Sequence, residues 1–537
     1  MTPASKELPG KPASSGLRAP AESGQVLFSF PPGDLNAAVA IHQQRLASDN
    51  AAQLDGLSLQ NLSNLGRTEL HSAAMEWTGK YCDLPAGLES PATDAKPFVL
   101  SGHQPTLFHP GVWFKNFILS RLGRKLNAVA INLIIDNDIS DIPAVMIPLI
   151  GTNRATWQSV AYDLNSARLP HEFHKLHDRK TLASFAERLT SSVSPWVDNP
   201  LVHRLWPHVL ESANTFSELG FALAAGRHRL ESELKLQTLE IPLSRVCQTA
   251  AFSHFVAAIF SRASDFASVH NRSLNQFREQ HGIRSQSHPL PPLAIDGKSI
   301  ELPFWIYSRE FPNRKRLIVR QTANGTVFEG PDGRPVAVDS NNPAEQLHEL
   351  SRGQICLRPR ALLTTMYSRM VLSDLFVHGI GGAIYDQITD SIAAELFGWT
   401  LPPFATTTGT FRLAGWSPGS AASHLACLHE QLRAIHYHPE TFVGYSTDTA
   451  ALIQAKKQLV SEMGLTAGRR ERHVDMIRLN AQLRSHLSER ARLLEEEIES
   501  KKSLQVQNRI VASREVTFCA HPEALPREIA GSAASVF

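Results

Sequence analysis

The fold is decided by residues 97–135, which read PFVLSGHQPTLFHPGVWFKNFILSRLGRKLNAVAINLII. This stretch opens with a short apolar run of strand length, which Gly-His-Gln-Pro at 102–105 interrupts. Apolar side chains then recur at helical spacing over 112–126, and 128–135 form a nearly continuous apolar run, which is typical of parallel strands covered on both faces. Strand, turn, helix and strand in this order predict a βαβ unit of a parallel sheet.

Length and composition bound the class of protein. The chain has 537 residues, and because domains average roughly 150 residues, we expect several structural parts. Hydrophobic residues make up 42% and charged residues 19%, as in folded globular proteins. The formal net charge is only +2, without the concentrated basic patch that nucleic-acid binders carry, so we expect no nucleic-acid partner.

The five cysteines stand far apart and form no CxxC pair; they are Cys82, Cys247, Cys356, Cys427 and Cys519. An odd and scattered set predicts reduced thiols rather than a disulfide framework or a cysteine-built zinc site. None stands beside a histidine-bearing motif, which argues against a catalytic cysteine. We assign no metal-binding residues from the sequence.

The first residues predict a leader without a targeting function. Residues 1–25 are rich in Pro, Ala, Ser and Gly, and they lack the apolar core of a signal peptide. The longest strongly apolar run, 128–135, is far shorter than the ~20 residues needed to span a bilayer. We therefore expect a disordered leader on a cytoplasmic protein without a membrane partner.

The remaining chain predicts an α/β fold in four parts. We expect the first part of a Rossmann-like parallel-sheet core over 26–160 and an inserted helical and small antiparallel β region over 161–350. The core returns over 351–420, and a C-terminal α-helical coiled-coil arm with a tail follows over 421–537.

Local patterns support this division. Residues 156–239 have a mostly helical pattern, and Asn324-Gly325 between two alternating runs predicts a hairpin within the insertion. In the returning core, the spacing of apolar residues predicts two helices, 362–377 and 385–397, on either side of a glycine turn.

The last helical region carries apolar residues separated by threes, fours and their sums; they are Met476, Leu479, Leu483, Leu487, Leu494 and Ile498. With Glu and Lys beside them, this pattern resembles a short antiparallel or dimeric coiled coil, so we expect a homodimer formed through the arm. An amphipathic helix packed on its own domain accounts for the same spacing, and the sequence leaves both interpretations open.

The first candidate site is the turn after the strand near residue 100. Gly102 permits a sharp turn, the helix that follows offers free N–H groups to an anion, and ligands of doubly wound sheets bind at this carboxyl edge. Since imidazole titrates near neutrality, His103 is a candidate acid or base, with Gln104 and His109 as neighbouring substrate-binding candidates. Capping of the loop by the histidines is the structural alternative.

A second polar group follows the next strand and consists of Asp136, Asn137, Asp138 and Asp141. These residues reach the same sheet edge as His103, where carboxylates bind a ribose hydroxyl, a substrate amine or a hard cation. The structural alternative is that Asp and Asn form the turn and cap the next element. The shared edge favours function, with Asp136 and Asp138 as catalytic candidates beside His103.

The third candidate is the segment His378-Gly379-Ile380-Gly381-Gly382-Ala383-Ile384-Tyr385-Asp386, which contains a glycine turn. Gly381 and Gly382 permit the close approach of a ligand, and Tyr385 and Asp386 follow them. The turn lacks the Gly-Lys-Ser/Thr of a Walker A loop and the glycine spacing of a dinucleotide fingerprint.

Two arginines, Arg358 and Arg360, precede this turn. A guanidinium presents a planar fork of donors that matches a carboxylate or a phosphate, so both are substrate-binding candidates. Structural salt bridges are the alternative role.

In these segments the chain resembles the bacillithiol-synthesis cysteine-ligase family. The segments that carry the resemblance are Ser-Gly-His-Gln-Pro at 101–105 before an apolar helix, the acidic run at 136–141, Leu-Arg-Pro-Arg-Ala-Leu-Leu at 357–363 with the glycine turn leading to Tyr385, and Ser-Arg-Glu at 513–515. The order of parts also fits, and the resemblance extends over most of the chain after residue 95.

The resemblance implies a ligase that joins cysteine to a glucosaminyl-malate acceptor through an amide bond. The core of that family looks like those of class I aminoacyl-tRNA synthetases and nucleotidyltransferases, with which activation of a carboxyl group by ATP or another nucleotide is consistent. The implied roles place His103 and Gln104 in the pocket, Asp136, Asp138 and Asp141 on the amine or the sugar hydroxyls, and Gly381, Gly382 and Tyr385 on the other wall.

Departures from the family pattern keep other functions open. Ile135 and Asn137 stand where the family has a glutamate and a histidine, and Asn137 cannot transfer a proton as a histidine does. His109-Pro110-Gly111 stands where the family more often has glycines. The alternatives are a nucleotidyltransferase-like enzyme, although no Lys-Met-Ser-Lys-Ser-like loop is clear, and a non-catalytic dimeric relative.

Overall fold

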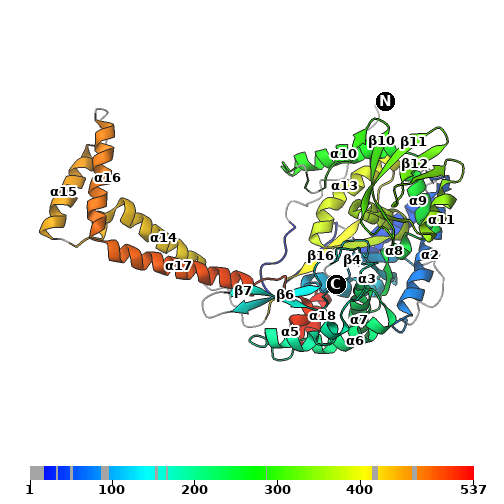
Figure 1. The fold of residues 1–537 in the computed structure, drawn as a ribbon, viewed down its shortest axis with the longest axis horizontal. Coiled ribbons are helices and arrows are strands. Elements are labelled where there is room, and N and C mark those ends of the chain that lie inside the picture. The colour runs from blue at the N-terminus through cyan, green and yellow to red at the C-terminus, as the bar shows by residue number, and fades with distance from the viewer. Residues whose placement is uncertain are drawn as a thin grey trace. The chain divides into compact units, whose positions relative to one another are not determined.

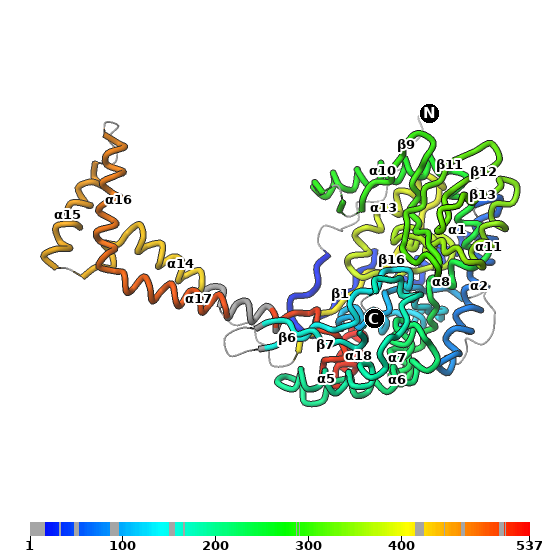
Figure 2. The backbone as a smooth tube through the Cα atoms, viewed as in Figure 1, coloured from blue at the N-terminus to red at the C-terminus, as the bar shows by residue number. Residues whose placement is uncertain are grey.

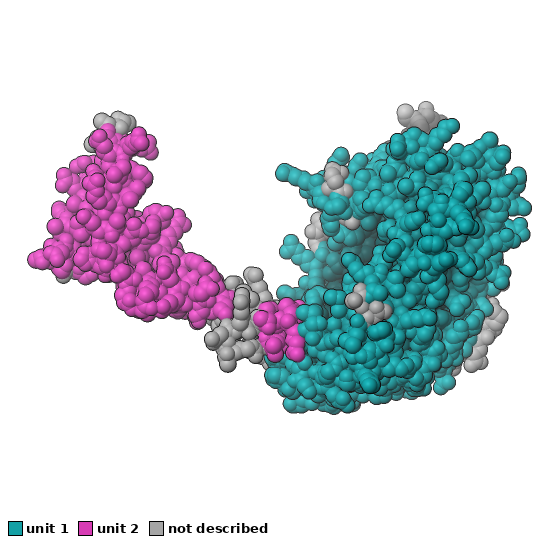
Figure 3. Space-filling view, in the orientation of Figure 1, with its two compact units in different colours: residues 1–147, 159–412, 514–537 teal, residues 148–158, 413–513 magenta. Residues whose placement is uncertain are grey.

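The structure is a computed structural model that describes residues 17–31, 34–48, 53–85, 96–150, 155–164, 167–285, 287–288, 290–413, 421–444, 446–462 and 468–537. The chain divides into two compact units (Figure 3). Unit 1 comprises Met1–Ile147, Ser159–Arg412 and Arg514–Phe537, and unit 2 comprises Pro148–Gln158 and Leu413–Ser513.

A six-stranded sheet organises unit 1 (Figure 1). In spatial order its strands are β1 (Val26–Ser29), β16 (Phe404–Gly409), β15 (Leu375–His378), β4 (Phe98–His103), β5 (Val129–Ile134) and β8 (Leu239–Pro242). All neighbouring pairs are parallel except β1 and β16. From β4 the chain adds β5 and β8 on one side and β15 and β16 on the other, so the strand order reverses between β4 and β15.

The predicted βαβ unit is confirmed. β4 and β5 pair in parallel with Phe98 opposite Val129 and His103 opposite Ile134, and α3 (Pro110–Lys125) connects them. The helix lies close against β5, because a Cβ atom on Gly123 would be only 2.9 Å from the Cβ of Ala130. The apolar runs of the sequence therefore correspond to strands buried under helices.

The two faces of the sheet bury different side chains. Phe98 and Phe376 belong to the large core with Ile388 and Ile392 of α13 (Ile380–Phe397). α2 (Leu59–Thr78) and α9 (Ala250–Phe260) contribute to the same core, while α3 contacts β4, β5 and β16. Both faces of the parallel strands are thus covered, as their apolar composition predicts.

A second, fully antiparallel sheet lies in the predicted insertion. Its strands in spatial order are β13 (Pro335–Asp339), β12 (Gly325–Glu329), β11 (Lys315–Thr322), β10 (Ser299–Tyr307) and β14 (Cys356–Pro359). Thr322 pairs with Gly325, which confirms the predicted hairpin. Gly325 has φ +138°, and a Cβ atom there would lie 2.1 Å from the carbonyl oxygen of Val338, so only glycine fits.

The other elements of the structure are α1 (Leu35–Ser48), β2 (Gln53–Leu54), β3 (Leu57–Ser58), β6 (Ala144–Ile150), β7 (Ala155–Ala161), α4 (Arg179–Ala183), α5 (Phe185–Val193), α6 (Val202–Thr215), α7 (Leu219–Glu233), α8 (Leu243–Val246), α10 (Ala263–Gln280), β9 (Ile295–Asp296), α11 (Pro343–Arg352), α12 (Ala361–Tyr367) and α18 (Leu525–Ala534). Short 3-10 turns lie at Pro439–Thr441 and Phe518–Ala520.

Three strands lie where the sequence predicts helix or no element, and two of them belong to the parallel sheet. The predicted helix 362–377 is α12 followed by a π-helical turn at Ser368–Leu372 and then by β15. β8 lies inside the predicted insertion, and β7 begins a region that was predicted helical. β8 and β15 have four residues each, too few for alternation to be visible, so tertiary pairing rather than local pattern decides them.

The chain start and chain end also differ from the expected division. Residues 1–16 of the predicted leader lie outside the described residues. Residues 17–25 run beside the end of β16, where the Gly24 N–H donates to the Thr410 carbonyl at 2.8 Å (Figure 2). At the other end, residues 514–537 fall in the range predicted as arm and C-terminal tail, and they form part of unit 1.

Unit 2 is helical, with α14 (Ala421–Tyr437), α15 (Thr447–Ser461), α16 (Arg469–Ser485) and α17 (Ser488–Val511). The predicted apolar stripe is split between α16 and α17. α14 packs against α17, where His424 lies 3.5 Å from Glu497, and against the end of α16, where Arg484 lies 2.5 Å from His436. Their interface buries Leu428, Ile435, Leu487, Leu494 and Ile498.

Within the described residues, no helix has both the length and the apolar character required to span a bilayer.

Candidate functional site

A cavity of about 430 Å³ lies at the carboxyl edge of the parallel sheet. Gly102 at the end of β4, Asn137 and Asp138 after β5, and His378 at the end of β15 line one side of it. These positions flank the place where the strand order reverses, which is where open α/β sheets bind their ligands. The cavity lies within the volume range of small-molecule sites.

The antiparallel sheet supplies a basic wall. The guanidinium carbons of Arg314 and Arg360 lie 4.6 and 4.4 Å from the ring centre of Trp305. Arg316 also lines the cavity, and Glu301 lies 2.8 Å from Arg360 and 3.5 Å from Arg316. Cation–π contacts hold guanidinium groups in a fixed orientation while their edges stay able to donate.

This wall carries an excess of positive charge. Three guanidinium groups, of Arg314, Arg316 and Arg360, stand against the two carboxylates of Asp138 and Glu301. The Nε atom of Arg360 is buried and has no hydrogen-bond partner among the described residues. A buried charged donor without a partner is costly, so the wall favours a ligand that brings a carboxylate or phosphate.

The acidic segment after β5 is tied to both walls. Asp138 accepts a hydrogen bond from Gln104 Nε2 at 2.5 Å and lies 3.1 Å from Arg314. The Asn137 amide donates to the Pro359 carbonyl at 2.8 Å, and its own backbone carbonyl accepts from Arg314. The Asp138 side chain is 43% exposed, so it remains accessible to a ligand.

Asp136 points away from this cavity. Its carboxylate is fully buried and accepts from the Ser244 N–H at 2.9 Å, while Oδ2 has no partner among the described residues. Burial, with the nearby charge of Glu172, raises the pKa of Asp136 to about 7. Asp136 is therefore buried beneath the cavity lining and does not line the cavity.

The two predicted histidines of the β4–α3 turn have other environments. The His103 ring packs edge-on against Phe108 with centroids 5.0 Å apart, and its Nδ1 donates to the Gln104 carbonyl at 3.2 Å. Burial and the charge of Lys115 lower the pKa of His103 to about 3. His109 caps α3, because its Nδ1 accepts from the Gly111 N–H at 3.1 Å.

Neither histidine lines the 430 Å³ cavity. The predicted set of His103, Asp136 and Asp138 is therefore not gathered at one surface, since Asp138 alone of the three lines this cavity. Gln104 and Asp141 line a neighbouring cavity of about 270 Å³ together with His171.

The residues on either side of the glycine turn, His378 and Asp386, contact each other at the site. His378 Nε2 lies 2.8 Å from Asp386 Oδ2, and Arg369 and Thr365 also donate to Asp386, at 2.7 and 2.8 Å. Burial disfavours the charged form of Asp386, but the charges of Arg369 and His378 outweigh it and hold the pKa of this carboxyl below its usual value. Asp386 thus holds the His378 ring through its Nε2 atom.

The remaining predicted residues of this turn lie apart from the cavity lining. An added Cβ on Gly381 would meet nothing within 4 Å, whereas one on Gly382 would lie 2.7 Å from His378 Nδ1. The Tyr385 hydroxyl lies 3.4 Å from His288 Nε2.

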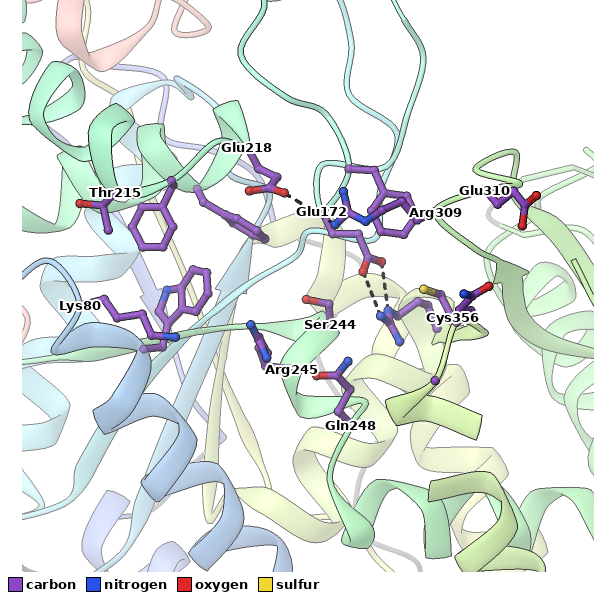
Figure 4. Close-up of a pocket in the computed structure, with 17 residues that line it drawn as sticks. Lys80, Glu172, Thr215, Glu218, Ser244, Arg245, Gln248, Arg309, Glu310 and Cys356 are labelled. Atoms are coloured by element: carbon purple, nitrogen blue, oxygen red, sulfur yellow. Dashed lines mark hydrogen bonds and ion pairs between the residues drawn. The ribbon is translucent and has the colours of Figure 1, made fainter. Parts of the chain in front are cut away.

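Arg358 lines a larger cavity of about 810 Å³ on the other side of β14 (Figure 4). Its guanidinium donates twice to Glu172, at 3.0 and 2.9 Å, and the Tyr307 hydroxyl donates to the same carboxylate. Lys80 and Glu310 lie on opposite sides of this cavity.

Sequence reasoning did not select Trp305, Arg314 or Arg316 of the first cavity, and it included His378 in the glycine-turn segment without giving it a role. It also missed Lys115 of α3, whose Nζ donates to the Gly102 carbonyl at 2.5 Å and whose pKa burial lowers to about 8. The basic triplet Arg314-Lys315-Arg316 near Trp305 is the one signal that was available.

No protein-family model matches this chain, and no curated protein matches it.

Within the described part of the chain, no three His, Cys, Asp or Glu side chains gather as a metal ion would require. The charged and titratable side chains that line the 430 Å³ cavity are Asp138, His270, Arg314, Arg316, Arg360 and His378.

Proposed function

We propose that the protein is a ligase that joins cysteine, or another amino acid, to a small amino-sugar acceptor such as glucosaminyl-malate. The observation that carries this proposal is the composition of the 430 Å³ cavity. Gly102, Asn137 with Asp138, and Arg360 come from three separate segments that resemble the cysteine-ligase family, and all of them line it.

The chemistry of the acceptor matches the two walls. Glucosaminyl-malate carries two carboxylates on its malyl group and an amine on its sugar. Arg314, Arg316 and Arg360 supply donors for the carboxylates, and Asp138 supplies an acceptor for the amine or a sugar hydroxyl. Because two anionic groups would be neutralised by a wall with excess positive charge, this class of acceptor suits the cavity better than a neutral sugar.

Amide formation from a free carboxylate requires activation, and a nucleotide would supply the leaving group. The 810 Å³ cavity is large enough for a nucleotide, and its lining combines aromatic side chains such as Trp77 with the cations Lys80, Arg245 and Arg309 and the acids Glu172, Glu218 and Glu310. We propose that these residues hold the nucleotide, with the cations on its phosphates. β14 separates the two cavities, since Arg358 faces one and Pro359 the other.

Finer features of the architecture belong to the same proposal. The parallel order β8-β5-β4-β15-β16 supports a Rossmann-like core, because it equals 3-2-1-4-5 when these strands are numbered along the chain. The buried α14–α17 interface supports a coiled-coil arm. We propose a cytoplasmic homodimer formed through this arm, with small molecules and not nucleic acid as ligands.

Two other functions lead to different expectations. A non-catalytic relative would fill the cavity with its own side chains, whereas this protein leaves about 430 Å³ open beside the Nε of Arg360, which has no hydrogen-bond partner among the described residues. A nucleotidyltransferase-like enzyme would use the 810 Å³ cavity without an amino acid. Release of pyrophosphate in the absence of any amino acid would favour that alternative.

A comparison of thiol metabolites tests the proposal in cells. Extracts of cells with and without this gene are labelled with a thiol-specific reagent and analysed by mass spectrometry. The proposal predicts that a cysteine-containing conjugate disappears in the deletion and returns with the wild-type gene but not with Arg360→Met. An unchanged thiol pool would rule out cysteine as the amino acid that is joined.

A further inference from the structure

His378 occupies a distinctive position in the cavity. It is the last residue of β15, directly across the strand-order reversal from the end of β4, and it lines the 430 Å³ cavity. Its ring packs between Phe376 and Phe404, with centroid distances of 4.5 and 5.0 Å. The ring is therefore held in one orientation by aromatic neighbours on both sides.

The partner of Nε2 fixes the tautomer of this ring. Asp386 Oδ2 lies 2.8 Å from Nε2, and an ionised carboxylate only accepts hydrogen bonds. The Arg369 charge at 2.7 Å keeps Asp386 ionised. The proton of the neutral ring is therefore on Nε2, and the lone pair is on Nδ1.

Nδ1 lies beside a glycine, whose lack of a side chain leaves room next to this nitrogen. The nearest element is the first turn of α13, where Gly382 has no side chain, and an added Cβ there would lie 2.7 Å from Nδ1. The charged groups that act on the ring are Asp386 of α13, Arg369 of the π-helical turn and Lys115 of α3. Burial lowers the pKa of His378, the Asp386 carboxylate opposes this, and both cations add to the lowering.

We propose that His378 is the general base of the ligation and that Asp386 is the positioning residue that holds its tautomer. This inference rests on the proposed function. His103 is a weaker base candidate, because its Nδ1 is engaged by the Gln104 carbonyl and it does not line the cavity. A carboxylate behind a histidine is the arrangement that orients general bases in other acyl-transfer enzymes.

Ligation takes place in two steps. The amino acid is first activated as an acyl phosphate or acyl adenylate with a nucleoside triphosphate. The amine nitrogen of the acceptor attacks the acyl carbon and forms the C–N bond, and the C–O bond to phosphorus-bound oxygen breaks. The leaving phosphate or nucleotide departs with the bonding electron pair, and the amine proton passes to His378 Nδ1.

Two substitutions test the roles of His378 and Asp386 separately. His378→Gln keeps an N–H donor for Asp386 near the position of Nε2 but has no titratable nitrogen. Asp386→Asn can present its amide group to Nε2 and so favours the tautomer with the proton on Nδ1. We expect ligation to fall about 10²- to 10⁴-fold in His378→Gln with little change in KM for the acceptor. The fall in the ligation rate at acidic pH that is due to protonation of His378 should be absent in His378→Gln.

Hydroxylamine separates this inference from the proposed function. It is a strong nucleophile at neutral pH and needs no general base, so hydroxamate formed from cysteine reports activation alone. The inference predicts that His378→Gln and Asp386→Asn form hydroxamate at close to the wild-type rate while ligation to glucosaminyl-malate is lost. Melting curves of both variants show whether they remain folded.

Each outcome decides one question. Equal loss of hydroxamate formation and ligation in a folded His378→Gln variant would overturn the inference, because the residue would then act in activation or binding. Wild-type ligation retained by the variant would overturn it as well. If the wild-type protein forms neither hydroxamate nor conjugate, the proposed function fails before the role of His378 is reached.

Discussion

The Nδ1 atom of His378 lies 2.7 Å from the position that a Cβ atom would take on Gly382. Gly381 and Gly382 are both exposed, and neither has a positive φ, so the backbone conformation does not require glycine at either position. The close approach to the ring is the reason that Gly382, and not Gly381, tolerates no side chain.

Gly382→Ala should therefore lower ligation activity by displacing the His378 ring, with little change in thermal stability. A displacement of about 1 Å at a catalytic group is able to cost 10²-fold in rate. Gly381→Ala is the matched control, since its Cβ would meet nothing within 4 Å. Steady-state kinetics and melting curves of both variants check the prediction. Equal losses in the two would instead assign the role to the glycine turn as a whole.

Arg360→Met should weaken binding of the acceptor. The substitution keeps an apolar chain over Trp305 but removes the donors that we assign to a carboxylate. Since a hydrogen bond to a charged group contributes about 1.5–3 kcal/mol, KM for the acceptor should rise on the order of 10- to 100-fold. Arg320→Met on the same strand as Arg316, but outside the cavity lining, is the control and should behave as wild type.

Asp136→Asn should change stability in a pH-dependent way. Burial raises the pKa of Asp136 in the folded protein to about 7, whereas its ordinary value is 3.8, so the folded state binds this proton more tightly than the unfolded state. Its contribution to stability is present below pH 3.8 and is lost as the pH rises through about 7.

The variant cannot ionise, so it should melt at a higher temperature than the wild type at pH 8. The difference should shrink between pH 7 and pH 4 and vanish below that. Paired melting curves across this range check the prediction. A difference that stays constant with pH would mean that Asp136 is not buried in its charged form at pH 8.

The two neighbouring leucines of α17 provide a test within unit 2. Leu494 is 9% exposed and belongs to the α14–α17 core, whereas Leu493 is 53% exposed. Leu494→Ala should destabilise the α14–α17 pair by about 2 kcal/mol or more, and Leu493→Ala should have almost no effect. Hydrogen exchange of the amides of α17 compares the two. Similar protection in both variants would contradict the assigned helix interface.

The part of the fold that the sequence predicted is the part with long, strongly patterned segments. β4, α3 and β5 follow from the apolar runs of residues 97–135, and Asn324-Gly325 marks a real hairpin. β8 and β15 were not predicted, because a strand of four residues is too short to show a period. In addition, no Gly or Pro separates β15 from α12 and the π-helical turn that precede it. Their place is decided by pairing with distant strands.

The site was predictable to a similar degree. Gly102, Asn137 and Asp138 were placed at the sheet edge by the rule that ligands bind at the carboxyl ends of parallel strands, and Arg360 was selected for its guanidinium group alone. The orientation of Asp136 toward Ser244 was not predictable, because adjacent residues after a strand turn to different sides. Arg314 and Trp305 reach the cavity from an inserted sheet, whose docking no local pattern encodes.

The most direct test of the account is ligation by the purified protein. The wild-type chain is incubated with cysteine, magnesium ATP and glucosaminyl-malate, and the products are resolved by mass spectrometry. The account predicts a conjugate with the mass of acceptor plus cysteine minus one water, formed by the wild type and strongly reduced in Arg360→Met. If the folded wild-type protein forms no such conjugate with cysteine or with any other amino acid, the assignment as an amino-acid ligase is wrong.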